Sequence, residues 1–198
     1  MVSNINNEDW CDAFSYYKGQ MADWINQILR QHKVENCTEY FQSLNKSPNA
    51  SKMIANTQKG AILISNVLLQ SIVNENIVVH RYLKIKHMRK LTKSRILKRG
   101  MTFSDYAILS TTLVESQMRD LIKQNHCNCV LHIYVPAGTH GVFIPSKYET
   151  DVIESEMLLP PNIKLRIVDI KYNLFNRIHY EIDCVVDTKE MIITQCRK

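Results

Sequence analysis

The stretch Glu154-Ser155-Glu156-Met157-Leu158-Leu159-Pro160 sets two carboxylates just before an apolar run and a proline turn. Residues two apart on a β-strand share a face, so Glu154 and Glu156 lie side by side if this stretch is a strand. Two carboxylates on one face repel each other, and a cationic group between them relieves that repulsion. The stretch therefore predicts either a pair of glutamates that binds a cationic centre or an exposed acidic strand start, since charge runs are usually solvated.

Two further motifs precede this stretch. Arg81 follows the apolar run Ile77-Val78-Val79, and Ser110-Thr111-Thr112 follows another apolar run. The forked guanidinium of arginine suits bidentate contacts with phosphate oxygens, and a serine hydroxyl can donate a hydrogen bond that fixes a carboxylate. Each motif alone has an ordinary alternative, which is a charged strand edge for Arg81 and a β-favouring strand for the Ser/Thr run.

In this order, the three motifs resemble those of the mono-ADP-ribosyltransferase toxins and effectors of the Arg-Ser-Glu class. Gly100 and Tyr106 before the serine, and the apolar triplet after the glutamates, extend the match over roughly residues 77–170. The resemblance implies NAD as the substrate, bound by residues of these motifs: Arg81, Tyr82 through its backbone, Ser110, Thr111, Thr112 and Glu156. It further implies a second basic contact to phosphate, with Arg119 and Lys123 as candidates, and an acceptor loop containing Tyr148 and Glu149.

The resemblance also implies a role for each catalytic residue. Cleavage of the bond between nicotinamide and ribose leaves an oxocarbenium-like ribose, which the carboxylate of Glu156 would stabilise. Glu154 would orient an arginine of the target protein and take its proton as general base. Ser110 would hold Glu156, and Arg81 would bind phosphate and fix the pose of NAD. This chemistry needs no metal.

The expected function is transfer of ADP-ribose from NAD to a protein, with arginine as the acceptor and nicotinamide as the leaving group. NAD glycohydrolysis, in which water replaces the acceptor, is the first alternative. A catalytically inactive basic binding module is the second, and the intact Arg81, Ser110 and Glu156 speak against it. Because bacterial toxins and effectors dominate the class, the resemblance implies secretion or injection and a target protein in the host cytosol; action in the cytoplasm of the producing cell is the alternative.

The bulk properties favour one domain of class α+β. A chain of 198 residues is of single-domain size, so residues 1–198 are expected to form one transferase domain. Residues 1–75 show helical periodicity, whereas residues 76–198 contain short β-branched runs. Helices followed by strands favour α+β over alternating α/β. By resemblance, the N-terminal helices pack on two antiparallel β-sheets, with the NAD cleft between the sheets.

The pattern predicts particular elements. Expected helices include residues 10–28, 40–44, 51–73 and 115–124, and the third of them is expected to turn Ile62, Leu63, Val67 and Leu68 inward. Expected strands are residues 77–83, 107–113, 130–135, 141–144, 153–159, 164–172, 179–186 and 191–195.

The net charge and the cysteines indicate which partners and which thiol redox state to expect. The net charge is +6, and eight of the 25 basic residues fall within 84–99. Such a patch could attract nucleic acid, an anionic membrane surface or an acidic protein, although a solvated face beside the cleft is the simpler interpretation, and nucleic acid is not expected as a partner. No apolar run approaches 18 residues, so we expect no membrane span, and the N-terminus lacks the pattern of a secretory signal. The protein is expected to be a monomer. The six cysteines are expected to be reduced, and the spacing around Cys127 and Cys129 does not match the usual zinc sites.

Overall fold

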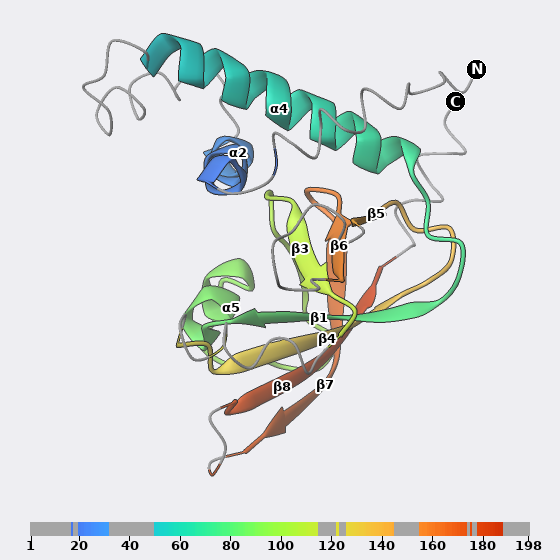
Figure 1. Ribbon diagram of the computed structural model, residues 1–198. Coiled ribbons are helices and arrows are strands. Elements are labelled where there is room, and N and C mark those ends of the chain that lie inside the picture. Colours follow the sequence, from blue (N-terminus) through green and yellow to red (C-terminus); the bar gives the residue numbers. More distant parts are fainter. Residues whose placement is uncertain are drawn as a thin grey trace.

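The computed structural model describes residues 17, 20–31, 50–114, 122, 126–144, 155–173, 175 and 178–187. Three helices lie in this part of the chain: α2 (Gln20–Gln31), α4 (Ala50–Gln70) and α5 (Ile85–Leu91). α2 and α4 lie together at one end of the molecule, and α5 lies apart from them beside the strands (Figure 1). The predictions for residues 40–44, 115–124 and 191–195 fall almost entirely outside the described residues.

The strands form one mixed sheet of eight, with the order β2-β7-β8-β4-β1-β3-β6-β5. Their bounds are β1 (Ile77–Leu83), β2 (Thr102–Ser104), β3 (Leu109–Thr112), β4 (Cys129–Val135), β5 (Val142–Ile144), β6 (Glu156–Leu159), β7 (Lys164–Tyr172) and β8 (Tyr180–Val186). All neighbours are antiparallel except β4 and β8, which run parallel. The α+β class agrees with the prediction, but the expectation of two separate antiparallel sheets is wrong, because β1 pairs with strands of both groups.

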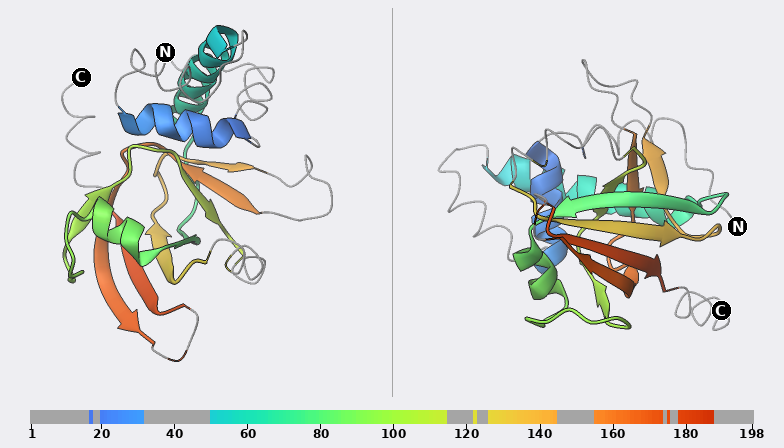
Figure 2. Two further views of the ribbon diagram at one scale, coloured as in Figure 1. Left: turned by 90° about the vertical axis from the view of Figure 1, so that its left-hand side faces the viewer. Right: turned by 90° about the horizontal axis from the view of Figure 1, so that it is seen from below.

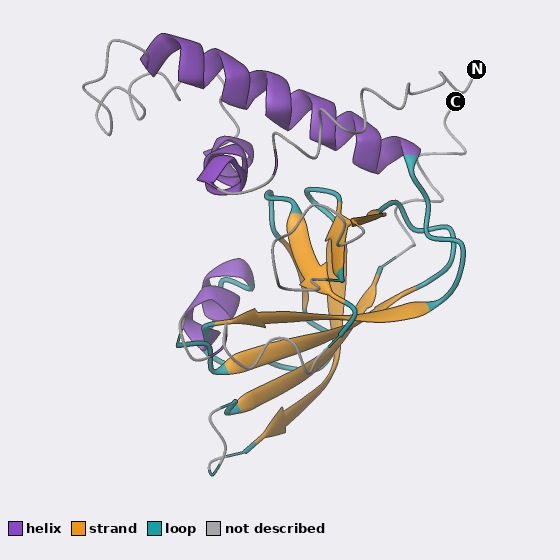
Figure 3. Ribbon diagram, in the orientation of Figure 1, coloured by secondary structure: helices purple, strands orange, loops and turns teal. Residues whose placement is uncertain are grey.

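The sheet bends sharply at β1. This strand pairs with β4 along its whole length, from Ile77↔Val135 to Leu83↔Cys129, whereas its described pairing with β3 is the single pair His80↔Thr112. A single pair leaves β3, β6 and β5 room to turn, and they stand at a steep angle to β1, β4, β8 and β7 (Figure 3). Two further views show α4 crossing α2 beyond this turned group (Figure 2).

Two apolar clusters hold these layers together. The first lies within the bent sheet and includes the fully buried Ile133, to which α5 contributes Met88. The second lies between the helices and the turned strands and includes Ile64 of α4. Because side chains alternate along a strand, Leu158 of β6 faces the second cluster while Leu159 faces the first. The apolar run after Glu156 therefore forms a strand buried on both faces.

The structure also corrects details of the predicted elements. β1 and β7 have the bounds that the sequence predicts. Ile62 was expected to point inward but is 60% exposed, because an α4 face that buries Ile64 and Leu68 turns residue 62 outward. α5 and β2 were not predicted. α5 is a short basic helix in which Met88 is the buried residue, and β2 has just three residues, so neither shows a clear periodicity.

Candidate active site

The register of β3 and β6 brings a serine and a glutamate together. Thr112 lies opposite Glu156, so Ser110, two residues earlier on the same face, lies diagonally across from it. The Ser110 hydroxyl donates a hydrogen bond of 2.5 Å to Oε1 of Glu156. A hydrogen bond from a hydroxyl to a carboxylate fixes the rotamer of the carboxylate. The contact that the sequence led us to expect between these two side chains is present.

Arg81 joins this pair from the neighbouring strand. It follows the one described residue pair between β1 and β3, and its Nη1 donates a hydrogen bond of 2.8 Å to the carbonyl oxygen of Ser110. The guanidinium thus links the two strands where their backbone pairing ends. Burial lowers the pKa of Arg81 below its ordinary value, while the negative charge of nearby Asp105 acts in the opposite direction. Arg81, Ser110 and Glu156 therefore meet where the sheet divides.

The helical layer adds polar groups that the sequence did not reveal. Asn26 of α2 accepts the N–H of Ile108 at Oδ1 (3.0 Å) and donates from Nδ2 to the hydroxyl of Tyr17 (3.3 Å). Tyr17 is buried, and burial raises the pKa of its hydroxyl to about 12, with the nearby charge of Glu156 acting in the same direction. Asn26 thus ties the helical layer to the start of β3, next to Ser110.

An ion pair closes the other side of this region. Arg30, in the last turn of α2, donates two hydrogen bonds to the carboxylate of Asp105, from Nε (3.0 Å) and from Nη2 (2.8 Å). The Asp105 carboxylate also accepts the N–H of Ala107 (3.1 Å) and lies 3.6 Å from Nε2 of His87. Burial acts to raise the pKa of Asp105, but the bonds from His87, Arg30 and Ala107 outweigh it and hold that pKa well below its ordinary value. Residues 75 apart in the chain make this pair, and no local pattern could predict it.

A basic pocket adjoins the ion pair. Its volume is about 610 Å³, and α5, β2 and the turn before β7 line it. Among its described lining residues are one acid, Asp105, and four cations: Arg30, Lys90, Lys93 and Lys164. Since Asp105 is already bound to Arg30, the pocket carries an excess of positive charge, which suits the oxygens of a phosphate group.

The other predicted NAD contacts within the described part take different places. Thr111 is buried, and its hydroxyl donates a bond of 2.7 Å to a backbone carbonyl of β6, so it serves strand pairing. The Thr112 hydroxyl accepts the N–H of Val114 (3.2 Å) at the end of β3. Tyr82 follows Arg81 in β1, and its side chain points to the opposite face of the strand.

Five predicted residues lie outside the described part of the chain. They are Glu154, which was assigned to the acceptor, the basic candidates Arg119 and Lys123, and the acceptor-loop residues Tyr148 and Glu149. β6 is described from its first residue, Glu156. The roles of these five residues therefore stay predictions.

Across the described ranges, no three His, Cys, Asp or Glu side chains gather in a way that could hold a metal ion. Cys127, Cys129 and Cys184 are buried free thiols. Burial raises the pKa of Cys129 and that of Cys184 to about 12, which keeps both as unreactive thiols. No described helix has the length and apolar character needed to cross a membrane.

The chain is similar to known proteins in sequence and in fold. The family model for ADP-ribosyltransferase exoenzyme matches residues 3–196. Among curated proteins, none matches the sequence. Solved structures of similar fold include Plx2a, an ADP-ribosyltransferase toxin from Paenibacillus larvae, at 18% identity and a TM-score of 0.60, covering 93% of this chain and 88% of that chain.

Two more solved structures share the fold. C3stau2 from S. aureus, solved with NAD, has 17% identity and a TM-score of 0.64, covering 94% of this chain and 89% of its own. C2-I, the enzymatic component of the C2-toxin from Clostridium botulinum, has 18% identity and a TM-score of 0.65. That match covers 94% of this chain and 44% of C2-I.

Proposed function

The chain belongs to the ADP-ribosyltransferase exoenzyme family and is thus an NAD-using transferase, and we propose that Arg81, Ser110 and Glu156 form its catalytic centre. One observation carries this proposal: Ser110 bonds to the Glu156 carboxylate through its hydroxyl and to Arg81 through its carbonyl oxygen. Three groups from three strands are held to one another by contacts within the protein. Such preorganisation is what electrostatic catalysis requires.

Glu156 acts on the ribose in this proposal. The bond between ribose C1′ and the nicotinamide nitrogen breaks, and its electron pair leaves with nicotinamide. The ribose becomes oxocarbenium-like, and the carboxylate, bound through a ribose hydroxyl, stabilises the developing positive charge. Ser110 keeps the carboxylate in place by its hydrogen bond.

The phosphates of NAD occupy the basic side of the region. Arg81 lies within electrostatic reach of Asp105 and Arg30, which line the basic pocket, so one diphosphate can lie between Arg81 and this pocket. Lys90 and Lys93 would then face the ADP half of NAD. Arg119 and Lys123 stay as candidates for a second phosphate contact. Tyr82 would contribute through its backbone, and Thr111 and Thr112 by holding Ser110 in register.

The acceptor is an arginine of a target protein. Glu154, two residues before Glu156, orients the guanidinium and takes its proton while the freed nitrogen lone pair attacks C1′. Tyr148 and Glu149 belong to the loop that recognises the target. The toxins among the similar structures favour a host-cell protein as the target and delivery into the host cytosol.

The decisive experiment separates the two glutamates. Nicotinamide release from NAD and labelling of a small arginine-like guanidine acceptor are measured in parallel for Glu156→Gln, Glu154→Gln and Glu75→Gln, an exposed control. Glu156→Gln should lose both activities, because an amide cannot supply the negative charge. Glu154→Gln should lose transfer and retain hydrolysis, because water needs no guanidine base.

Three other results would change the proposal. Full activity in Glu156→Gln would remove the catalytic centre. Full arginine transfer in Glu154→Gln would remove arginine as the acceptor. NAD hydrolysis without transfer in the unaltered protein, tested with host lysate as well, would leave NAD glycohydrolysis as the function.

A further inference from the structure

The loop between α5 and β2 presents one isoleucine to solvent. Ile96 is 68% exposed, whereas its neighbour Leu97 packs against the first apolar cluster. The Ser94 hydroxyl donates to the carbonyl of Ile96 (2.7 Å) and accepts its N–H (3.3 Å), which closes a tight turn. Gly100 then donates its N–H to the carbonyl of Ile167 on β7 (2.8 Å). These hydrogen bonds hold the backbone of the loop, so they fix Ile96 in its exposed position.

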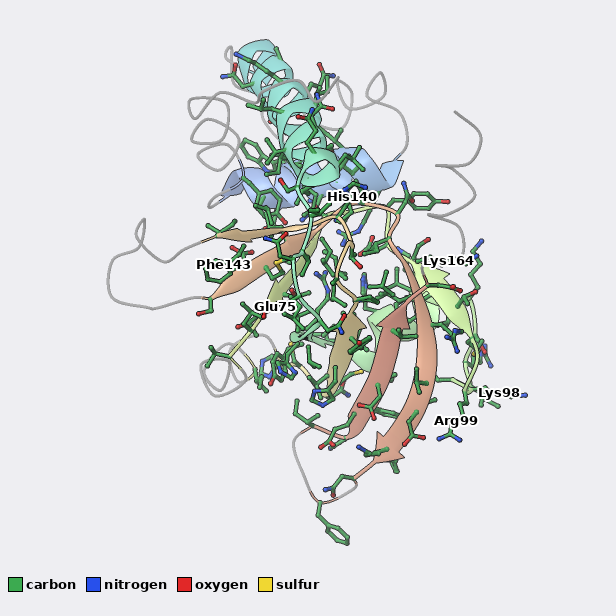
Figure 4. All side chains as sticks on the ribbon, turned by 90° about the vertical axis from the view of Figure 1, so that its right-hand side faces the viewer. Glu75, Lys98, Arg99, His140, Phe143 and Lys164 are labelled. Carbon is green, nitrogen blue, oxygen red and sulfur yellow. The ribbon has the colours of Figure 1, made fainter. Side chains whose placement is uncertain are left out.

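Cations flank this isoleucine. Eight exposed basic residues lie between β1 and β2: Lys84, Lys86, Arg89, Lys90, Lys93, Arg95, Lys98 and Arg99. Lys90 and Lys93 line the basic pocket, and the other six do not. Of these six, Arg99 alone has an ion-pair partner within the described chain, Asp169 at 2.9 Å. Lys98 and Arg99 lie on the side of the molecule that also carries Lys164 (Figure 4). We call the six cations together with Ile96 the basic edge.

We propose that the basic edge docks the protein on an anionic phospholipid surface, with Ile96 entering the headgroup region. Clustered lysine and arginine side chains are attracted to the negative surface potential of phosphatidylserine-containing membranes. Transfer of an exposed aliphatic side chain from water to the boundary between headgroups and acyl chains is favourable, because apolar surface is removed from water. The two features together fit a lipid surface better than either does alone.

The same features argue against the other anionic partners. Proteins that hold single-stranded nucleic acid stack its bases on aromatic side chains, and the basic edge contains none. A specific protein interface usually centres on a well-packed aromatic or arginine anchor. Here the exposed apolar group is a single isoleucine, and the exposed cations Arg95 and Lys98 lie within two residues of it along the chain. A fluid surface of repeated negative headgroups matches this arrangement.

Docking is separate from the proposed chemistry. Arg95, Ile96 and Lys98 do not line the basic pocket or contact Arg81, Ser110 or Glu156. Changes at these three positions should leave NAD hydrolysis in solution unaltered. The docking proposal can therefore fail while the catalytic proposal stands, and the reverse is also true.

The test is co-sedimentation with vesicles of phosphatidylcholine alone and with vesicles that also contain phosphatidylserine. The unaltered protein should bind the second kind and lose binding as salt rises. Arg95→Gln with Lys98→Gln should lower the partition coefficient about 25-fold, at roughly fivefold per charge. Ile96→Ser should lower it about tenfold without changing the net charge. Lys52→Gln with Lys59→Gln on α4 removes as much charge elsewhere and should cost little.

Several results would overturn the proposal. Equal binding to both kinds of vesicle, or none to either, would do so. If the α4 control variant lost as much vesicle binding, the binding would depend on net charge and not on the basic edge. Binding of a single-stranded oligonucleotide that depends on Arg95 and Lys98, without vesicle binding, would assign the edge to nucleic acid. Circular dichroism and NAD hydrolysis in solution check the fold of each variant, and Ile96→Ser alone suffices if the double variant does not fold.

Discussion

Asp105→Asn tests the ion pair that joins α2 to the strand region. The side chain of Asp105 is 4% exposed and the side chain of Arg30 is 38% exposed, and two hydrogen bonds of 3.0 and 2.8 Å connect them. A hydrogen bond to a charged group contributes about 1.5–3 kcal/mol. Because Arg30 can regain water when the pair is broken, we expect a loss of about 2 kcal/mol in the free energy of unfolding. For a chain of this length, that lowers the melting temperature by roughly 4–8 °C.

The assay is urea unfolding, with Asp169→Asn as the matched control. Asp169 accepts a bond of similar length, 2.9 Å from Arg99, but the two side chains are 39% and 72% exposed. Exposed pairs contribute about 0–1 kcal/mol, so the control should cost less than half as much. Equal losses in the two variants would refute the argument that burial makes the Arg30 pair matter.

The pH dependence gives a second check on the same pair. The pKa of Asp105 lies below its ordinary value in the folded chain, so the folded state binds fewer protons than the unfolded one as the solution is acidified. Its contribution to stability is complete above about pH 4 and disappears as the pH falls further. The difference between the unaltered protein and Asp105→Asn should shrink in acid, and a difference that stays constant would contradict the assignment.

Three other predictions follow from the site. Ser110→Ala should lower kcat roughly 10- to 150-fold through loss of the bond to the catalytic carboxylate. Ser65→Ala, whose buried hydroxyl has no hydrogen-bond partner among the described residues, should be neutral in the same NAD-hydrolysis assay. Unfolded Tyr17 ionises near pH 10.0 and folded Tyr17 near 12, so stability should fall by about 2–3 kcal/mol over that interval, and Tyr17→Phe should abolish this fall; identical slopes in alkaline denaturation would count against it. Lys90→Gln with Lys93→Gln should raise the KM for NAD severalfold at low salt and leave kcat unaltered, and an unchanged KM would remove the basic pocket from the NAD site.

Local sequence patterns predicted much of the strand layout. β1 and β7 are β-branched runs bounded by turns, and the structure has them with the predicted bounds. The three motifs were placed on strands, and the register of β3 with β6 brings Ser110 to Glu156 as expected. These features depend on residues that are close in the chain, or on a pattern of residues that a whole family shares.

Other features depend on contacts that no local pattern encodes. The bend of the sheet arises because β1 meets β3 at one described pair, and a sequence carries no visible sign of where pairing stops. Arg30 and Asp105 find each other across 75 residues, and Asn26 reaches Ile108 across 82. α5 could not be predicted from its pattern, because a basic helix with one buried residue lacks an apolar stripe.

The position of Arg81 has a consequence for the stability of the fold. Its guanidinium donates a hydrogen bond to a neutral carbonyl, and nearby Asp105 is already bound to Arg30. A diphosphate bound there would neutralise this charge, so part of the folding free energy should be supplied by the substrate. We expect a chain that loosens readily where NAD is scarce and tightens where NAD is abundant.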